Sequence, residues 1–256
     1  MAEIRAENVR VYFVGVKAVD GVDLTLRAGE LLGLIGPNGA GKTTLVNALT
    51  GFQKPTGGRV FLDDLEITGW APQKIGRHGV GRTFQGVRVF RELTAFENVE
   101  LGALGVGASR KEARRRASEL LERMDLADRA DRKAGSLPYG DERRIGLLRV
   151  LAMMPSLLML DEPAAGMNET ESHALMAAIA DIRDEFGCGV LVIEHDMRVI
   201  MRLCERIQVL DYGKTISVGT PAEVQRDPGV ITAYLGSKRG ASAATAPDSS
   251  EDPDAA

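Results

Sequence analysis

The sequence predicts an α/β fold with a mainly parallel sheet that helices cover on both faces. Two observations support this prediction. Short apolar runs alternate along the chain with longer amphipathic segments, as expected for strands that are connected by helices. The runs at 31–35, 157–160 and 190–193 are apolar without interruption, which is typical of strands buried on both faces.

The composition fits one large domain, or one domain with a small subdomain. The chain has 256 residues, a hydrophobic content of 44% and a net charge of -4. This balance argues against nucleic acid as a partner, because nucleic-acid binders usually have a strong basic excess. No stretch approaches the roughly 18 apolar residues that a membrane helix needs, and no secretory signal is visible. Work at a membrane would therefore require a partner.

The N-terminal part predicts strands around one short helix. Residues 3–13 and 22–26 alternate between apolar and polar side chains, which indicates an added antiparallel β part. A glycine-rich loop leads into a helix at 42–49. Further strands are expected at 59–62 and 79–83.

The middle of the chain is rich in helix signals. Residues 95–134 are expected to be mainly helical, and 141–153 form a second helix. The block at about 86–154 is therefore predicted to be a helical subdomain that is inserted into the main domain.

The helix expected at 110–124 has charges that favour it. Glu112 and Arg116 are four residues apart, and so are Glu119 and Arg123. Pairs at this spacing face each other on a helix and stabilise it. Because acidic residues interleave its arginines, this surface is interpreted as a solvated face.

The C-terminal third repeats the α/β pattern. Helices are expected at 169–186 and 197–203, a hairpin at 206–218, and a short helix that ends near Leu235. Residues 237–256 have no large apolar side chain and are predicted to be a disordered tail. The domain is therefore expected to span 1–236.

The two cysteines, Cys188 and Cys204, lack metal-ligand spacing and are interpreted as free thiols in a reducing compartment.

The glycine-rich loop has the full pattern of a phosphate-binding P-loop, GxxxxGK[ST]. Its residues are Gly36, Pro37, Asn38, Gly39, Ala40, Gly41, Lys42 and Thr43, and Thr44 follows. Backbone N–H groups and the helix N-terminus would hold the phosphates of ATP. Lys42 is expected to reach the β- and γ-phosphates, and the Thr43 hydroxyl to ligate Mg²⁺. The alternative, an ordinary glycine-rich turn, does not account for the full match between a strand and a helix.

A second apolar strand, at 157–160, ends in two carboxylates. Asp161 and Glu162 would lie at the carboxyl edge of the sheet, where α/β folds place their ligands. Asp161 is expected to hold Mg²⁺, directly or through water, and Glu162 to polarise the attacking water as a general base. Strands that end in acidic residues are common, so this prediction depends on the P-loop upstream.

These motifs in this order resemble the ATPase subunits of ABC transporters over residues 3–235. The resemblance implies a P-loop NTPase core with an added antiparallel β part and a helical signature subdomain. Gln85, in the run Arg-Thr-Phe-Gln, is similar to the glutamine that contacts Mg²⁺ and links the nucleotide site to the membrane partner. His195, after the strand expected at 190–193, is similar to the switch histidine that contacts the γ-phosphate.

The signature loop of that family has its counterpart here in an unusual form. The residues in its place are Leu137, Pro138, Tyr139, Gly140 and Asp141, where the commonest form is Leu-Ser-Gly-Gly-Gln. The family's serine is absent, so backbone N–H groups and the helix N-terminus are expected to carry the phosphate contact. The resemblance implies that this loop acts on the nucleotide of a second ATPase subunit.

Two further residue types are interpreted by the same resemblance. Phe13 lies where an aromatic ring stacks on adenine in the family, with Tyr12 as the neighbouring candidate and a core aromatic as the alternative. In the loop after Glu162 the usual aspartate is Asn168, which implies a dimer contact with less charge.

The resemblance narrows to the ATPases of branched-chain amino-acid importers. It rests on RTFQGVRVF from residue 82, LPYG from 137, EPAAGMN from 162, IEHDM from 193 and AYLG from 233. The resemblance implies a subunit that hydrolyses ATP to power import. It also implies a second ATPase subunit (identical or related), two membrane permease subunits and an indirect solute-binding protein. The place implied is the cytoplasmic face of the inner membrane, reached through the permeases.

Two other classes of protein compete with this interpretation. A soluble ABC ATPase of DNA repair or translation would carry very long helical insertions or two fused cassettes, and this chain has one cassette with a short insertion. A P-loop kinase or GTPase is disfavoured because the signature region is present and the Asn-Lys-x-Asp guanine motif is absent.

Overall fold

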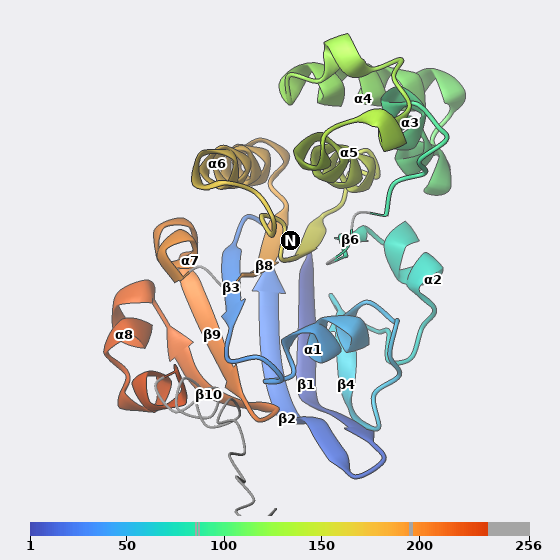
Figure 1. Ribbon diagram of the computed structural model, residues 1–256. Coiled ribbons are helices and arrows are strands. Elements are labelled where there is room, and N and C mark those ends of the chain that lie inside the picture. Colours follow the sequence, from blue (N-terminus) through green and yellow to red (C-terminus); the bar gives the residue numbers. More distant parts are fainter. Residues whose placement is uncertain (85, 87, 195–196, 235–256) are drawn as a thin grey trace, which may run out of the picture.

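The computed structural model describes residues 1–84, 86, 88–194 and 197–234. Its first sheet is antiparallel and has four strands in the order β2-β1-β4-β5 (Figure 1). Their bounds are Val16–Arg27 for β2, Glu3–Phe13 for β1, Gly57–Leu62 for β4 and Leu65–Glu66 for β5. This sheet confirms the predicted antiparallel part.

The second sheet has six strands in the order β10-β9-β3-β8-β7-β6. Their bounds are Lys214–Gly219 for β10, Arg206–Asp211 for β9, Leu31–Ile35 for β3, Gly189–Ile193 for β8, Leu157–Asp161 for β7 and Val80–Arg82 for β6. All neighbours pair in parallel except β10, which is antiparallel to β9. The prediction of a mainly parallel sheet is confirmed.

The described residues include several α-helices. They are α1 (Lys42–Leu49), α2 (Pro72–Arg77), α3 (Ala95–Gly105), α4 (Arg110–Arg123), α5 (Tyr139–Leu151), α6 (Glu169–Phe186), α7 (Met197–Leu203) and α8 (Pro221–Arg226). Residues 228–234 are also helical. Helices α3, α4 and α5 gather at the top of the view in Figure 1, away from the antiparallel sheet, as expected for a helical subdomain. Within the described ranges, no helix combines the length and apolar composition needed to cross a lipid bilayer.

Strand β7 is buried on both faces because its side chains alternate between two cores. Leu158 and Leu160 belong to the apolar cluster that contains the helical subdomain and α6. Leu157 and Met159 belong to the other cluster, together with β1 and α1. Since α1 shares this second cluster with both sheets, its buried side chains pack between them. This packing fixes the position of the P-loop that precedes α1.

The structure differs from the predictions in several elements, among them β2, α2 and α5. Strand β2 begins at Val16, well before residue 22, because β1 and β2 pair up to Phe13 and Val16. Helix α2 was not expected, since its six residues carry too few apolar positions to show a period. Helix α5 begins at Tyr139 and not at Asp141, so the last three of the five signature-loop residues are helical.

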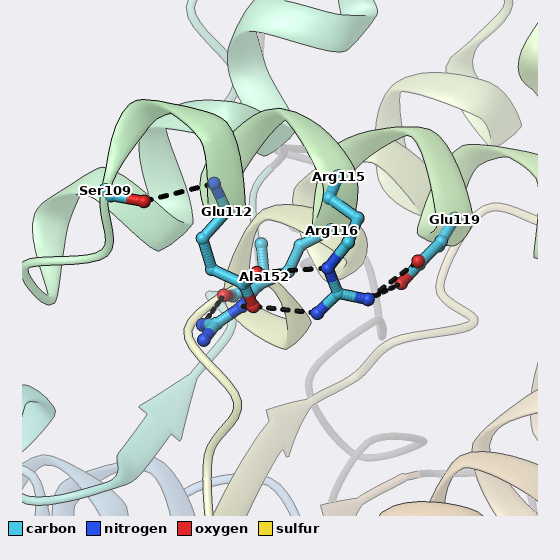
Figure 2. Close-up of polar contacts among 6 residues, drawn as sticks. All are labelled: Ser109, Glu112, Arg115, Arg116, Glu119 and Ala152. Atoms are coloured by element: carbon cyan, nitrogen blue, oxygen red, sulfur yellow. Dashed lines mark hydrogen bonds and ion pairs between the residues drawn. The ribbon is translucent and has the colours of Figure 1, made fainter.

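One of the two predicted ion pairs on α4 is confirmed and the other is wrong. The Nε atom of Arg116 is 2.7 Å from Oε1 of Glu112, as predicted. Glu119 pairs with Arg115 and not with Arg123, which pairs with Glu185 of α6. Figure 2 shows the contacts of Glu112, Arg115, Arg116 and Glu119, and there Arg116 also donates to the carbonyl of Ala152 at the end of α5. The side chain of Arg116 therefore links α4 to α5.

Candidate nucleotide-binding site

The predicted P-loop connects β3 to α1 and can only be built with glycine at its end. Gly41 is the N-cap of α1 and has a φ of 99°. A Cβ atom at this position would lie 2.2 Å from the carbonyl oxygen of Ala18. The first turn of α1 has no acidic side chain, so its N–H groups and partial positive charge are available to an anion.

Lys42 is buried beneath this loop and points back into it. Its Nζ atom donates to the carbonyl of Gly36 at 2.7 Å and to that of Pro37 at 3.0 Å. Burial lowers the pKa of Lys42, and the nearby carboxylates of Glu162 and Asp161 oppose that shift. The ammonium group is thus close to both carboxylates that the sequence predicted to lie beside it.

Asp161 is the last residue of β7 and is buried, and its two carboxylate oxygens differ in their contacts. Its Oδ2 atom is 3.4 Å from Nη2 of Arg82, whereas Oδ1 accepts no hydrogen bond from the part of the chain that the structure describes. Burial raises the pKa of Asp161, and the charge of Arg82 and the hydroxyl of Thr43 act in the opposite direction. A buried carboxylate oxygen without a partner, next to a hydroxyl, fits the oxygen ligands that Mg²⁺ prefers.

Glu162 follows in an unusual backbone conformation. Its φ is 50°, in the left-handed region that side chains rarely adopt. Its amide donates to the carbonyl of Ile193 in β8 at 2.9 Å, which fixes the end of β7 against the neighbouring strand. The residue is 8% exposed and lies on the wall of the cavity at the P-loop.

A cavity of about 500 Å³ opens along the P-loop, within the range typical of ligand sites. The described residues that line it are Val16, Lys17, Ala18, Asn38, Gly39, Ala40, Gly41, Lys42, Thr43, Thr44, Glu162 and Tyr212. The structure thus brings the predicted loop and the predicted base together. The contributions of β2 and of Tyr212 to the cavity were not predicted from the sequence. Tyr212 lies in the turn between β9 and β10, where only the hairpin was recognised.

The aromatic candidates for adenine lie beside this cavity and not in its wall. Tyr12 donates its hydroxyl proton to Oδ1 of Asp20 at 2.5 Å, which raises its pKa. Phe13 is 49% exposed at the end of β1 and is not among the residues that line the cavity. The stacking of either ring on adenine stays a prediction.

The signature-loop residues lie elsewhere in the chain's own structure. Leu137 is buried, Pro138 caps α5, and Tyr139, Gly140 and Asp141 form its first turn. Asp141 is buried and pairs with Arg129, so its carboxylate already has a partner. None of these five residues lines the cavity at the P-loop of the described chain.

Gln85 and His195 fall outside the described residues, so their predicted roles stay predictions. Their described neighbours lie next to the site. Thr83 donates its amide to the carbonyl of Met159 in β7, and Glu194 accepts a hydrogen bond from the amide of Ala164. Strands β6 and β8 thus end on either side of β7.

Known proteins are similar to this chain in sequence and in fold. The ABC transporter family matches residues 19–165, and the branched-chain amino acid ATP-binding cassette transporter family matches residues 214–239. LivG of Salmonella typhimurium, a high-affinity branched-chain amino acid transport ATP-binding protein, is 46% identical and the match covers 91% of this chain and 97% of LivG. BraF of Pseudomonas aeruginosa, described in the same words, is 43% identical with the same coverage.

Solved structures agree with these matches. The crystal structure of the ADP conformation of an ATP-binding cassette from an ABC transporter has a TM-score of 0.83 and 31% identity, and covers 92% of this chain and 99% of that one. The chain therefore belongs to the ABC transporter family as an ATP-binding subunit, and it is an ATPase. Within that family it carries the C-terminal segment of the branched-chain amino acid cassettes.

Proposed function

We propose that this ATPase hydrolyses Mg-ATP in the cavity at the P-loop to power the import of branched-chain or related amino acids. The observation that supports the proposal most strongly is the position of Glu162 in the wall of the cavity that Lys42 and Thr43 also line. A carboxylate there can accept a proton from water while the P-loop holds the phosphate that this water attacks.

Each residue of the site has a role in this proposal. The P-loop amides and Lys42 bind the phosphates, and Thr43, Asp161 and Gln85 hold Mg²⁺. The metal ion would neutralise charge that develops on the phosphate oxygens. Glu162 is the general base, and His195 contacts the γ-phosphate.

The remaining contacts of the nucleotide would come from two places. Phe13 would stack on adenine. The loop at 137–141 has no place in the chain's own cavity, so we assign it to the nucleotide of a second ATPase subunit. A related cassette, 30% identical with a TM-score of 0.77 and matched over 85% of this chain and 98% of its own, is dimeric with ADP and Pi bound.

We infer the partners of this chain from its relatives. LivG and BraF are ATP-binding proteins of branched-chain amino acid transport, and the family that matches residues 214–239 is that of branched-chain amino acid ATP-binding cassette transporters. We therefore assign to this chain a second ATPase subunit, two permease subunits and a solute-binding protein that acts through the permeases. Its place is the cytoplasmic face of the inner membrane, where the permeases hold it.

The substitution Glu162→Gln tests the assignment of the base. It keeps the shape of the side chain and removes the carboxylate, so the variant should bind Mg-ATP as the wild type does. Its turnover should fall by about 10²-fold or more. Binding is measured by calorimetry and turnover by phosphate release. Hydrolysis at the wild-type rate would refute this function for Glu162.

A further inference from the structure

Arg143 of α5 reaches the backbone that carries the proposed base. Its Nη1 atom donates to the carbonyl oxygen of Glu162 at 2.5 Å and to that of Pro163 at 2.8 Å. One guanidinium group thus bridges two consecutive carbonyls just after the end of β7. The hydrogen bonds join the first turns of α5 to the loop that leaves the catalytic strand.

The bridged segment has a conformation that needs support. Glu162 has a φ of 50°, and a non-glycine residue in this region is strained and keeps such a conformation only where its surroundings impose it. The carbonyl of Glu162 also accepts from the amide of Ala165 at 3.2 Å, which closes a tight turn with Pro163 at its second position. Arg143 therefore adds a charged donor to a turn that has one weak hydrogen bond of its own.

Tyr139 holds Arg143 in this position. Its hydroxyl oxygen accepts from Nε of Arg143 at 3.2 Å, and the guanidinium carbon is 5.3 Å from the ring centroid. The same ring covers Gly166, where a Cβ atom would lie 3.0 Å from Cε1 of Tyr139 and where φ is 80°. A glycine at position 139, as in the commonest signature loop, could make none of these contacts.

We propose that Arg143 is a positioning residue for ATP hydrolysis, which fixes the backbone of Glu162 so that its carboxylate faces the cavity. Tyr139 orients the guanidinium group from the other side. This inference rests on the proposed function, because it acts through the base assigned there. It also gives a physical role to the departure of this signature loop from the common pattern.

The test compares turnover and binding in the assembled transporter, with the full-length chain. Arg143→Ala should lower kcat at least tenfold and leave the Kd for Mg-ATP within twofold, because Arg143 does not line the nucleotide cavity. Tyr139→Phe, which removes one hydroxyl, should lower kcat only a few-fold. Arg143→Lys keeps a charged donor and should recover part of the loss. Arg115→Ala, on the exposed face of α4, is the control and should match the wild type.

A double-mutant cycle with Glu162→Gln separates positioning from a general structural effect. If Arg143 acts through Glu162, then Arg143→Ala should not lower further the residual single-turnover rate of the Glu162→Gln variant. The same fold-loss in both backgrounds, or an unchanged kcat in Arg143→Ala alone, would overturn the inference.

Two further outcomes are distinguishable. If Arg143→Ala loses its cooperative thermal transition, the cycle is run with Arg143→Lys. The smaller loss of turnover in this variant should likewise vanish in the Glu162→Gln background. A loss that persists there would count against the inference. Full turnover in Glu162→Gln alone would instead refute the function proposed for that residue, whatever the result at Arg143.

Discussion

Arg82 and Asp161 form an ion pair inside the protein. Nη2 of Arg82 is 3.4 Å from Oδ2 of Asp161, and the two side chains are 5% and 2% exposed. The same guanidinium donates to Oδ1 of Asn47 at 2.6 Å and to Oγ1 of Thr50 at 2.9 Å, both at the end of α1. One side chain thus joins β6, the P-loop helix and the proposed magnesium ligand.

Loss of Arg82 should destabilise the fold. Burial lowers the pKa of Arg82 and raises that of Asp161, so each charge depends on the other. Arg82→Met would leave Asp161 buried without its counter-ion, which costs about 3 kcal/mol and should lower Tm by roughly 10 °C in calorimetry. Arg59→Met is the control, because Arg59 pairs with Glu7 at the surface and should change Tm by about 3 °C or less. Equal shifts in both variants would contradict this account.

Lys42→Ala should weaken nucleotide binding. The Nζ atom lies under the P-loop and already bonds two of its carbonyls, so the charge is placed for a phosphate at little further entropic cost. The Kd for Mg-ATP in calorimetry should rise at least tenfold, about 1.4 kcal/mol. Lys111→Ala, on the surface of α4, should leave the Kd unchanged. A Kd within twofold of the wild type in Lys42→Ala would argue against the site.

Gly146→Ala should stabilise the protein. Gly146 lies inside α5, and a Cβ atom there would meet nothing within 4 Å. Alanine in a helix interior is favoured over glycine by about 0.5–1 kcal/mol, so the urea midpoint should rise. Gly102→Ala in α3 is the contrasting variant, since its Cβ would lie 1.8 Å from the carbonyl of Arg149 and should destabilise. A urea midpoint of Gly146→Ala below that of the wild type would contradict the free space that the structure shows around Gly146.

Glu112 should make stability depend on acidic pH. Hydrogen bonds from Arg115 and Arg116 lower its pKa from 4.5 to about 2 (Figure 2). Because the folded pKa is the lower one, its contribution is fully present above pH 4.5 and is lost as the pH falls through about 2. The difference in urea midpoint between wild type and Glu112→Gln should therefore shrink over that window.

The control for this titration is Glu122→Gln, on the same helix. Glu122 is exposed and has no ion pair among the described residues. The urea midpoint of Glu122→Gln should stay close to that of the wild type at every pH. If the difference in urea midpoint between wild type and Glu112→Gln is constant or grows towards low pH, the result would contradict the ion-pair network.

Local patterns were sufficient to predict the central strands and the P-loop. β3 and β8 are apolar throughout and β7 is apolar up to Asp161, and a buried parallel strand admits few other residues. The P-loop is recognisable because glycines and a lysine are needed at fixed spacing. By contrast, β2 was predicted only in part, since Val19 and Asp20 interrupt the alternation of apolar and polar residues in its first half.

Contacts between distant residues were beyond these patterns. Tyr212 was interpreted only as a hairpin turn, and it reaches the cavity because β9 lies next to β3. The ion pair of Glu119 with Arg115 could not be told from one with Arg123, since both spacings suit a helix. In the folded protein Arg123 pairs instead with Glu185 of α6.

The sequence by itself determined the class of protein, because phosphate binding requires a short, local run of glycines, lysine and threonine that few other functions produce. It also determined that Asp161 and Glu162 end a buried strand. Only the tertiary structure decided that Arg82 neutralises Asp161 and that Arg143 bridges the carbonyls of Glu162 and Pro163. Those contacts depend on how strands and helices pack. The long side chain of an arginine can reach several possible partners, and the distance between residues along the sequence does not show which one it contacts.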